Sequence, residues 1–413
     1  MARNKAKENV YSVILFLLLY GVTEAIASAG LYYLGEKRNV FYQPADTLSE
    51  KHQEKITELI EGKTQYYQWS STLGWTIQPN GSSRLFQANS AGFRGDRNYP
   101  LKPPDNILRI TSFGDSFTHG AEVKNHETWQ ATMEKSSGYE VLNFGVGAFG
   151  LDQAYLRYQK DGKQYESQVV LIGFMVENIY RHINTFRPFY FPQTGFPLGK
   201  PRFILEGGEL LEIPNALPTQ AHYQKLLQRP QSVLAEVGAH DRYYNRRYKS
   251  SLIDWSPTVR LVRILIQEFS DGDRQTWVSL NQIYHPESEA FQVTTAIFDR
   301  FYQEVQDNGS IPIIIIFPRW HDVQDYRTTD NRSYQPLLDR FAAQGYRYID
   351  LMDLFADEEL DLSKIFLTEY GHNSALGNQM IAERILDYLK DLQEAETLEL
   401  SLNRSPRPSI PLG

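Results

Sequence analysis

The sequence predicts an α/β fold in which a parallel sheet is covered by helices on both faces. Short, nearly continuous apolar runs alternate with helical segments, and several of these runs end in glycine or polar residues. Apolar runs of this kind are typical of parallel strands, which are buried on both faces. The chain has 413 residues, 41% of them hydrophobic and 22% charged, which suits one large globular domain or two smaller ones and excludes a largely disordered chain.

The alternation begins near residue 107 and is interrupted once. The expected strands are Ile107–Phe113, Glu140–Phe144, Gln168–Phe174, Ile311–Phe317 and Tyr346–Leu351. The expected core helices are Glu127–Ser137, Leu151–Lys160, Thr294–Asp307, 333–344 and Ala375–Leu392. The stretch 186–290 is rich in Pro and Tyr, has helical pieces near 219–237 and 256–270, and is predicted to be an insertion.

These elements set the expected domain boundaries. They are 1–35 as an amino-terminal membrane anchor or signal segment, 36–105 as an extension of short strands and loops, 106–185 and 291–392 as the two parts of the core, 186–290 as an inserted cap-like segment, and 393–413 as a Pro-rich tail.

The amino terminus carries a membrane signal. A basic head precedes Val10–Leu34, an apolar stretch long enough to span a bilayer with some tilt. Glu24 interrupts it at a cost of about 2.5–3.5 kcal/mol, which the apolar residues offset at about 0.3–0.6 kcal/mol each. We expect a retained single-pass anchor with residues 36–413 outside the cytoplasm. A secreted protein, cleaved after a signal peptide within Ala25–Ala29, and a buried core helix are the alternatives.

Composition excludes several classes of function. The formal net charge of −8 argues against a general nucleic-acid binder. The absence of Cys removes disulfides, thiolate nucleophiles and Cys-based metal centres. No phosphate loop, dinucleotide fingerprint or metal-ligand spacing is present, so neither a metal nor a cofactor is expected.

Four segments place polar or glycine-rich sequence where a site is expected, because ligand sites of doubly wound sheets form at the carboxyl ends of the strands. Gly114–Gly120 puts a Ser hydroxyl at a strand-to-helix turn, although such a Ser often only caps a helix. Asn143–Gly150 lets the backbone approach a ligand closely. The third, Gly173–Asn178, offers a side-chain amide, and the fourth, Glu369–His372, pairs a carboxylate with an imidazole.

Together these four segments resemble the blocks of the SGNH hydrolase superfamily, also called GDSL-like lipases and esterases, in its membrane-anchored bacterial form. The similarity covers about residues 85–185 and 294–392, with the approach segment Gly92–Gly95 included. The anchor, the extension and the insertion lie outside it. The resemblance implies a flavodoxin-like three-layer α/β/α fold with a central parallel sheet.

The resemblance also implies a serine-esterase mechanism. Ser116 would be the nucleophile that forms an acyl-enzyme, His372 the general base and then acid, and Glu369 the group that orients His372. The oxyanion would be held by the Ser116 N–H, a backbone N–H in the turn of Gly147 and Ala148, and the Asn178 side chain.

Three positions depart from the family's usual pattern. Glu369 stands where the family usually has Asp, and its longer side chain must be accommodated. Ala148 stands where Gly is usual, so its turn must tolerate a Cβ. The third block reads Glu177–Asn178 in place of the common Gly-x-Asn-Asp, which puts Asn178 one position out of the family's register.

The expected function is removal of an O-acyl group, acetyl in the first instance, from an extracytoplasmic carbohydrate or other ester. The expected partners are the ester-bearing substrate and the membrane, with no nucleic acid. Two alternatives stay open at this point. One is an O-acyltransferase that acts on an exported polysaccharide with the same triad, and the other is a catalytically inactive glycan-binding protein.

Overall fold

The computed structural model describes residues 2–38, 47–248, 253–270 and 280–394. The chain divides into two compact units. The first comprises Met1–Thr57, Asn184–Gly199 and Ala216–Ile283, and the second comprises Glu58–Ile183, Lys200–Asn215 and Tyr284–Gly413. The second unit contains the parallel sheet. Part of the predicted insertion, 200–215, belongs to the sheet unit, while the rest of 186–283 groups with the amino-terminal segment.

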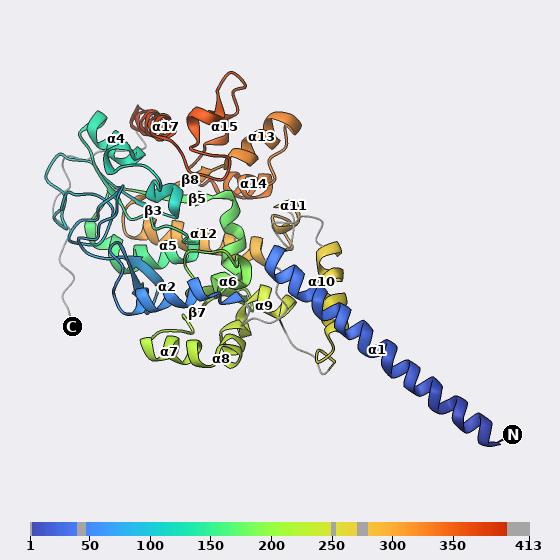
Figure 1. Cartoon of the computed structure of the whole chain (residues 1–413). Coiled ribbons are helices and arrows are strands. Elements are labelled where there is room, and N and C mark those ends of the chain that lie inside the picture. Colours follow the sequence, from blue (N-terminus) through green and yellow to red (C-terminus); the bar gives the residue numbers. More distant parts are fainter. Residues whose placement is uncertain (1, 39–46, 249–252, 271–279, 395–413) are drawn as a thin grey trace. The chain divides into compact units, whose positions relative to one another are not determined.

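A five-stranded parallel sheet forms the centre of the second unit (Figure 1). Its strands are β3 (Arg109–Phe113), β4 (Glu140–Asn143), β5 (Val169–Met175), β8 (Ile311–Phe317) and β9 (Tyr348–Asp350). The spatial order is β4-β3-β5-β8-β9. Ranked along the chain, this is the order 2-1-3-4-5 of flavodoxin-like sheets, so the predicted fold class is confirmed.

Helices cover both faces of the sheet. On one face α4 (Trp129–Ser137) packs against α17 (Ala375–Glu394), and on the other α5 (Leu151–Arg157) packs against α12 (Glu289–Asp307), which also contacts α14 (Gln335–Gln344). The strands are almost entirely buried between these layers, which explains their lack of polar alternation. The helix α12 begins five residues earlier than expected because Ser288 caps it, accepting a hydrogen bond from Phe291 N at 3.1 Å.

The extension contains a helix that the sequence analysis did not predict. This helix, α2 (Glu50–Ile60), buries Ile56, Leu59 and Ile60, a spacing of three to four residues that marks one helical face. An antiparallel hairpin of β1 (Tyr67–Ser70) and β2 (Gly74–Ile77) follows it, in keeping with the short strands expected there.

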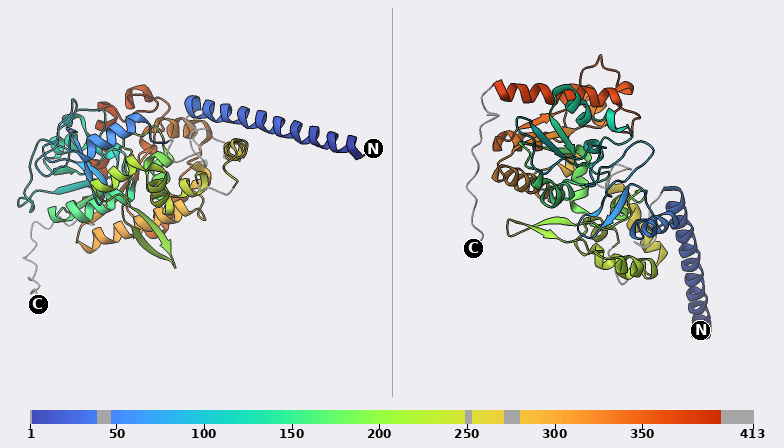
Figure 2. Two further views of the ribbon diagram at one scale, coloured as in Figure 1. Left: turned by 60° about the horizontal axis from the view of Figure 1, so that its bottom comes forward. Right: turned by 90° about the vertical axis from the view of Figure 1, so that its left-hand side faces the viewer.

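Shorter elements complete the two units. In the second unit these are α3 (Ser116–His119), the antiparallel pair β6 (Arg202–Glu206) and β7 (Glu209–Ile213), α13 (Trp320–Thr329), α15 (Met352–Phe355) and α16 (Leu362–Ile365), with the β6–β7 hairpin clear in Figure 2. In the first unit they are α6 (Arg187–Tyr190), α7 (Gln220–Gln228), α8 (Pro230–Val237), α9 (Arg242–Arg247), α10 (Pro257–Ser270) and α11 (Leu280–Ile283).

The amino-terminal helix α1 (Ala2–Arg38) is long and apolar enough, over Asn9–Lys37, to cross a membrane. Its large apolar side chains are exposed, unlike those of a core helix inside a soluble domain. The Pro-rich tail expected at 393–413 lies almost wholly outside the described residues.

Candidate active site

The candidate site lies where the strand order of the sheet reverses. The strand β3 lies between β4 and β5, and the chain leaves β3 and β5 toward opposite faces. Ser116 follows β3 almost directly, and Asn178 follows β5. The carboxyl ends of these two neighbouring strands therefore bring the first and third sequence blocks together.

Glycines let the short helix α3 sit directly on the strand ends. A Cβ on Gly114 would lie 2.1 Å from Thr118 Oγ1, and one on Gly173 would lie 2.0 Å from the same atom. Asp115 caps α3, with its carboxylate accepting from Phe117 N at 2.8 Å. Ser116 is the first residue of α3 and is half-buried, which places its hydroxyl at the predicted strand-to-helix turn.

His372 comes from a distant part of the chain and lies beside this turn. Its ring centroid is 5.0 Å from that of Phe117, the residue after Ser116. Its Nδ1 is 3.1 Å from Glu122 Oε2, and its backbone N–H donates to the same oxygen at 3.1 Å. A proton held on Nδ1 leaves Nε2 as the basic nitrogen of the neutral ring. Within the described residues, no hydrogen bond joins Ser116 Oγ to His372.

Glu122 is a residue that sequence reasoning missed. It adopts a left-handed backbone conformation with φ of 70°, which costs a non-glycine residue about 1–2 kcal/mol. Such a conformation persists only where its surroundings impose it, and it often marks a functional site. The hydrogen bond from His372 lowers the pKa of the Glu122 carboxyl, so the carboxylate form persists into acidic solution.

Glu369 occupies a different environment. Its side chain is exposed. Among the described carboxylates, the one within hydrogen-bond distance of His372 Nδ1 belongs to Glu122. The assignment of Glu369 as the orienting group stays a prediction. No sequence motif pointed to Glu122, because its contact with His372 joins segments 250 residues apart.

Asn178 joins the first and third blocks. It lies in the 3₁₀ segment Val176–Ile183 after β5, is buried, and donates from Nδ2 to the second carboxylate oxygen of Asp115. The amide nitrogen carries two N–H groups, and Asp115 accepts one of them. Asn178 thus contacts Asp115, the residue immediately before Ser116. Its role in the oxyanion hole stays a prediction.

The turn of the second block is anchored on several sides. Val146 N donates to Gly114 O at 3.0 Å, and Gly147 O accepts from Trp75 Nε1 at 2.9 Å. Ala148 has a φ of 65°, so this turn holds a residue with a Cβ in a conformation that favours glycine. The turn predicted around Gly147 and Ala148 is therefore present, and its N–H groups stay candidates for the oxyanion hole.

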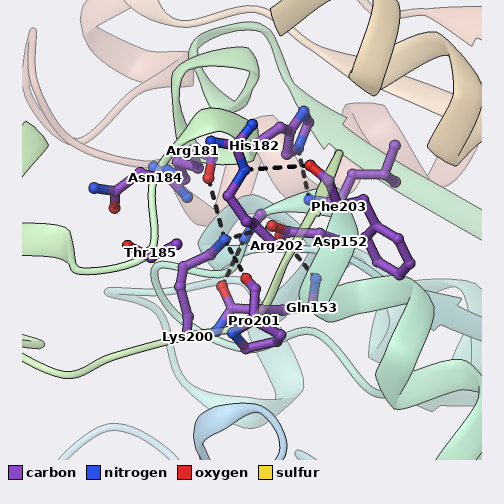
Figure 3. Close-up of polar contacts among 12 residues, drawn as sticks. Asp152, Gln153, Arg181, His182, Asn184, Thr185, Lys200, Pro201, Arg202 and Phe203 are labelled. Atoms are coloured by element: carbon purple, nitrogen blue, oxygen red, sulfur yellow. Dashed lines mark hydrogen bonds and ion pairs between the residues drawn. The ribbon is translucent and has the colours of Figure 1, made fainter. Parts of the chain in front are cut away.

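A buried ionic network lies at the start of α5, directly after the second block in the chain (Figure 3). Lys200 and Asp152 form an ion pair with side-chain exposures of 1% and 0%. Lys200 Nζ also donates to Arg181 O at 3.1 Å, and Arg181 donates to Phe149 O at 2.7 Å. His182 accepts from Leu151 N at 3.0 Å, and burial holds its pKa well below the usual value, so it is neutral. The network fixes the second block against the start of α5.

No group of three or more metal-ligating side chains is present within the described ranges. At the candidate site, the Glu122 carboxylate and the His372 ring contact each other at 3.1 Å.

Comparison with known proteins finds similarity to solved structures only. No family model and no curated protein matches the chain. A member of the lipolytic protein G-D-S-L family from Veillonella parvula is 12% identical, covers 69% of this chain and 99% of its own, and gives a TM-score of 0.33. A GDSL-like lipase from Bacteroides thetaiotaomicron is 9% identical, with coverages of 70% and 91% and a TM-score of 0.34.

A catalytic mutant of an acetylxylan esterase from Geobacillus stearothermophilus is 10% identical, with coverages of 73% and 100% and a TM-score of 0.34. The structural neighbours thus include GDSL-type lipolytic proteins and acetylxylan esterases. At these identities and TM-scores, we infer function from the residues of the site and not from the neighbours.

Proposed function

We propose that this chain is a serine esterase of the SGNH hydrolase type, with Ser116 as nucleophile and His372 as general base. One observation supports it most strongly. The ring of His372 lies against Phe117, beside Ser116, while its Nδ1 contacts a carboxylate at 3.1 Å. A hydroxyl, an imidazole and a carboxylate at the switch point of a doubly wound sheet are the groups that acyl transfer requires.

The proposed reaction has two halves. Ser116 Oγ attacks the acyl carbon while His372 Nε2 accepts the hydroxyl proton, and the imidazolium then protonates the leaving alcohol oxygen as its bond to the acyl carbon breaks. In the second half His372 takes a proton from water, the resulting hydroxide attacks the acyl-enzyme, and Ser116 regains its proton as the acid departs. The carboxylate on Nδ1 stabilises the imidazolium in both halves.

Three donors are proposed for the oxyanion: the Ser116 N–H, a backbone N–H of Gly147 or Ala148, and the side chain of Asn178. The contact of Asn178 with Asp115 supports its inclusion, because it holds the amide next to the nucleophile's turn. Removing one oxyanion donor typically lowers the rate by about 10²–10³-fold.

The orienting carboxylate has two candidates. The contact with His372 Nδ1 supports Glu122, whereas the sequence block supports Glu369. We propose Glu122 for this role, and the activities of Glu122→Gln and Glu369→Gln separate the two.

We further propose that the acyl group is acetyl on a carbohydrate outside the cytoplasm, and that α1 is a retained anchor. The exposed apolar surface of α1 supports the anchor. A reporter that is active only after export, fused after Gly413, is then active and stays with membranes through carbonate washing. A soluble product that begins near Ser28 would show cleavage, and an inactive reporter would contradict export.

Turnover of a small ester tests the enzymatic proposal. The full chain in detergent micelles hydrolyses 4-nitrophenyl acetate, and Ser116→Ala abolishes turnover. The matched control is Ser232→Ala, an exposed serine in α8, which keeps wild-type activity. Wild-type activity in Ser116→Ala would refute the nucleophile, and an inactive wild-type chain would favour a binding protein.

Product analysis separates hydrolase from transferase. With an acetylated oligosaccharide as donor, a hydrolase releases the same free acetate whether or not an acceptor is added. Acetyl groups that appear on the acceptor at the expense of free acetate, and that are lost in Ser116→Ala, would show a transferase.

A further inference from the structure

The first unit holds a second apolar segment, α10, that packs along the candidate membrane helix (Figures 1 and 2). The contact is made through Glu24, the acid that interrupts the apolar stretch of α1. Glu24 Oε1 accepts from Ser256 Oγ at 2.6 Å, and Oε2 accepts from Thr258 N at 3.1 Å. The carboxylate therefore satisfies a backbone N–H in the first turn of α10, which its own helix leaves without an acceptor.

Other contacts show the direction in which α10 runs. The rings of Tyr20 and Trp255 lie 6.3 Å apart, and a Cβ on Gly30 would lie 3.2 Å from Leu261 Cδ2. Tyr20, Glu24 and Gly30 follow one another along α1 over a rise of about 15 Å. They contact Trp255, then Ser256 and Thr258, then Leu261, in the same order along the chain. The helix α10 thus runs in the same direction as α1. Its start lies level with Glu24, near the middle of the span Asn9–Lys37.

The apolar and polar side chains of this segment are arranged as in a membrane protein. Over 253–266, where the side chains are described, the exposed large side chains are all apolar: Ile253, Trp255, Val262, Leu265 and Ile266, with Ile253 at 60% and Trp255 at 67% exposure. A soluble helix would turn such residues inward and its charges outward.

The charges of the segment are paired instead. Arg263 donates to both carboxylate oxygens of Asp254 at 2.6 Å, and the Asp254 side chain is only 7% exposed. Arg260 donates to the backbone carbonyl of Asp254. Within the described side chains of 253–266, Arg263 is thus paired with Asp254 and Arg260 is bonded to a backbone carbonyl, while apolar groups lie outside, as a lipid environment demands.

We propose that residues 253–266, named here the re-entrant arm, are embedded in the bilayer beside α1, with lipid acyl chains covering their exposed apolar side chains. The arm begins beside Tyr20 and Glu24, near the middle of the span, and continues toward Lys37, so it occupies mainly the leaflet at the Lys37 end and does not cross the membrane. This inference rests on the proposed membrane span of α1. The exposed apolar surface of the arm is continuous with that of α1.

The absence of Cys from the chain allows a direct test. Single-cysteine variants Trp255→Cys and Ile266→Cys carry a nitroxide label in the full chain, reconstituted in phosphatidylcholine nanodiscs. Ile26→Cys in α1 is the membrane reference, and Leu101→Cys, an exposed apolar position in the sheet unit, is the matched aqueous control. Collision rates with oxygen, which concentrates in acyl chains, and with a water-soluble nickel chelate report the surroundings of each label.

The re-entrant arm predicts that labels at 255 and 266 collide with oxygen much as the label at 26 does, with oxygen-to-nickel ratios several-fold above that at 101. If 26 is lipid-exposed while 255 and 266 collide with nickel as 101 does, the arm is refuted and the anchor stands. If 26 also collides with nickel, the anchor itself fails. Labels at 255 and 266 that are shielded from both reagents would mean that protein covers the face, which also refutes the proposal. Circular dichroism of each labelled chain confirms that the fold is kept.

Discussion

Replacing Glu122 by Gln tests how His372 is oriented. Glutamine keeps the length and shape of the side chain but removes the charge that stabilises the imidazolium, and it permits the wrong ring tautomer. In a serine protease the loss of the buried triad carboxylate costs about 10⁴-fold in rate. Here the Glu122 side chain is 51% exposed, so water takes over part of its function. We expect Glu122→Gln to lower kcat/KM by about 10²-fold, or about 2.7 kcal/mol of transition-state stabilisation.

The matched control is Glu369→Gln, which makes the same change at the carboxylate three residues before His372. We expect it to stay within about twofold of wild type, because Glu369 is exposed and the Nδ1 partner is Glu122. Both variants are assayed on 4-nitrophenyl acetate across pH, with circular dichroism as the check on folding. A silent Glu122→Gln beside a strongly impaired Glu369→Gln would refute the structural assignment and restore the sequence-based one.

Three further predictions concern stability, read from thermal or urea unfolding of the full chain in micelles. Ala148→Gly raises the free energy of unfolding by about 0.5–1 kcal/mol, because glycine adopts the left-handed conformation of this position without strain. The control Ala131→Gly, in the helix α4, lowers it by about 1 kcal/mol. A change of the same sign in both variants would contradict backbone strain at Ala148. Lys200→Met lowers the free energy of unfolding by about 3–5 kcal/mol, because it leaves the Asp152 carboxylate buried without its partner. The double variant with Asp152→Asn recovers part of this loss. A loss under about 1 kcal/mol in Lys200→Met would show that the ion pair is not buried in solution. The pKa of His182 is depressed in the folded chain, where the ring is neutral, so its contribution to the free energy of unfolding is fully present above pH 6.5. Below that value this contribution falls by about 1.4 kcal/mol per pH unit. A free energy of unfolding that rises when the wild-type chain is acidified from about pH 6.5 to 5.5 would contradict this sign.

The sheet was predictable because each strand is encoded by its own residues. Ile311–Phe317 was expected and found with the same bounds, and the ends of the other four strands shift by one or two residues at most. The carboxyl ends of parallel strands meet at one edge of the sheet, so the positions of Ser116 and Asn178 followed from local sequence as well.

The missing parts depend on contacts between distant segments. Glu122 and His372 are 250 residues apart, and Glu24 and Ser256 are 232 apart, so no window of sequence shows that they meet. The helix α2 was missed for a different reason. Its apolar face is narrow and the sequence around it is polar, which is typical of loops, and only the packing of the fold buries Ile56 and Leu59.

Covalent labelling of the nucleophile tests the central proposal most directly. The full chain in micelles is treated with a fluorophosphonate, digested, and the modified residue identified by mass spectrometry. A serine activated by His372 reacts, so we predict one adduct, on Ser116, that is absent from Ser116→Ala and forms far more slowly in His372→Ala. An unlabelled wild-type chain, or an adduct on another serine that persists in Ser116→Ala, would contradict a serine esterase built on this site.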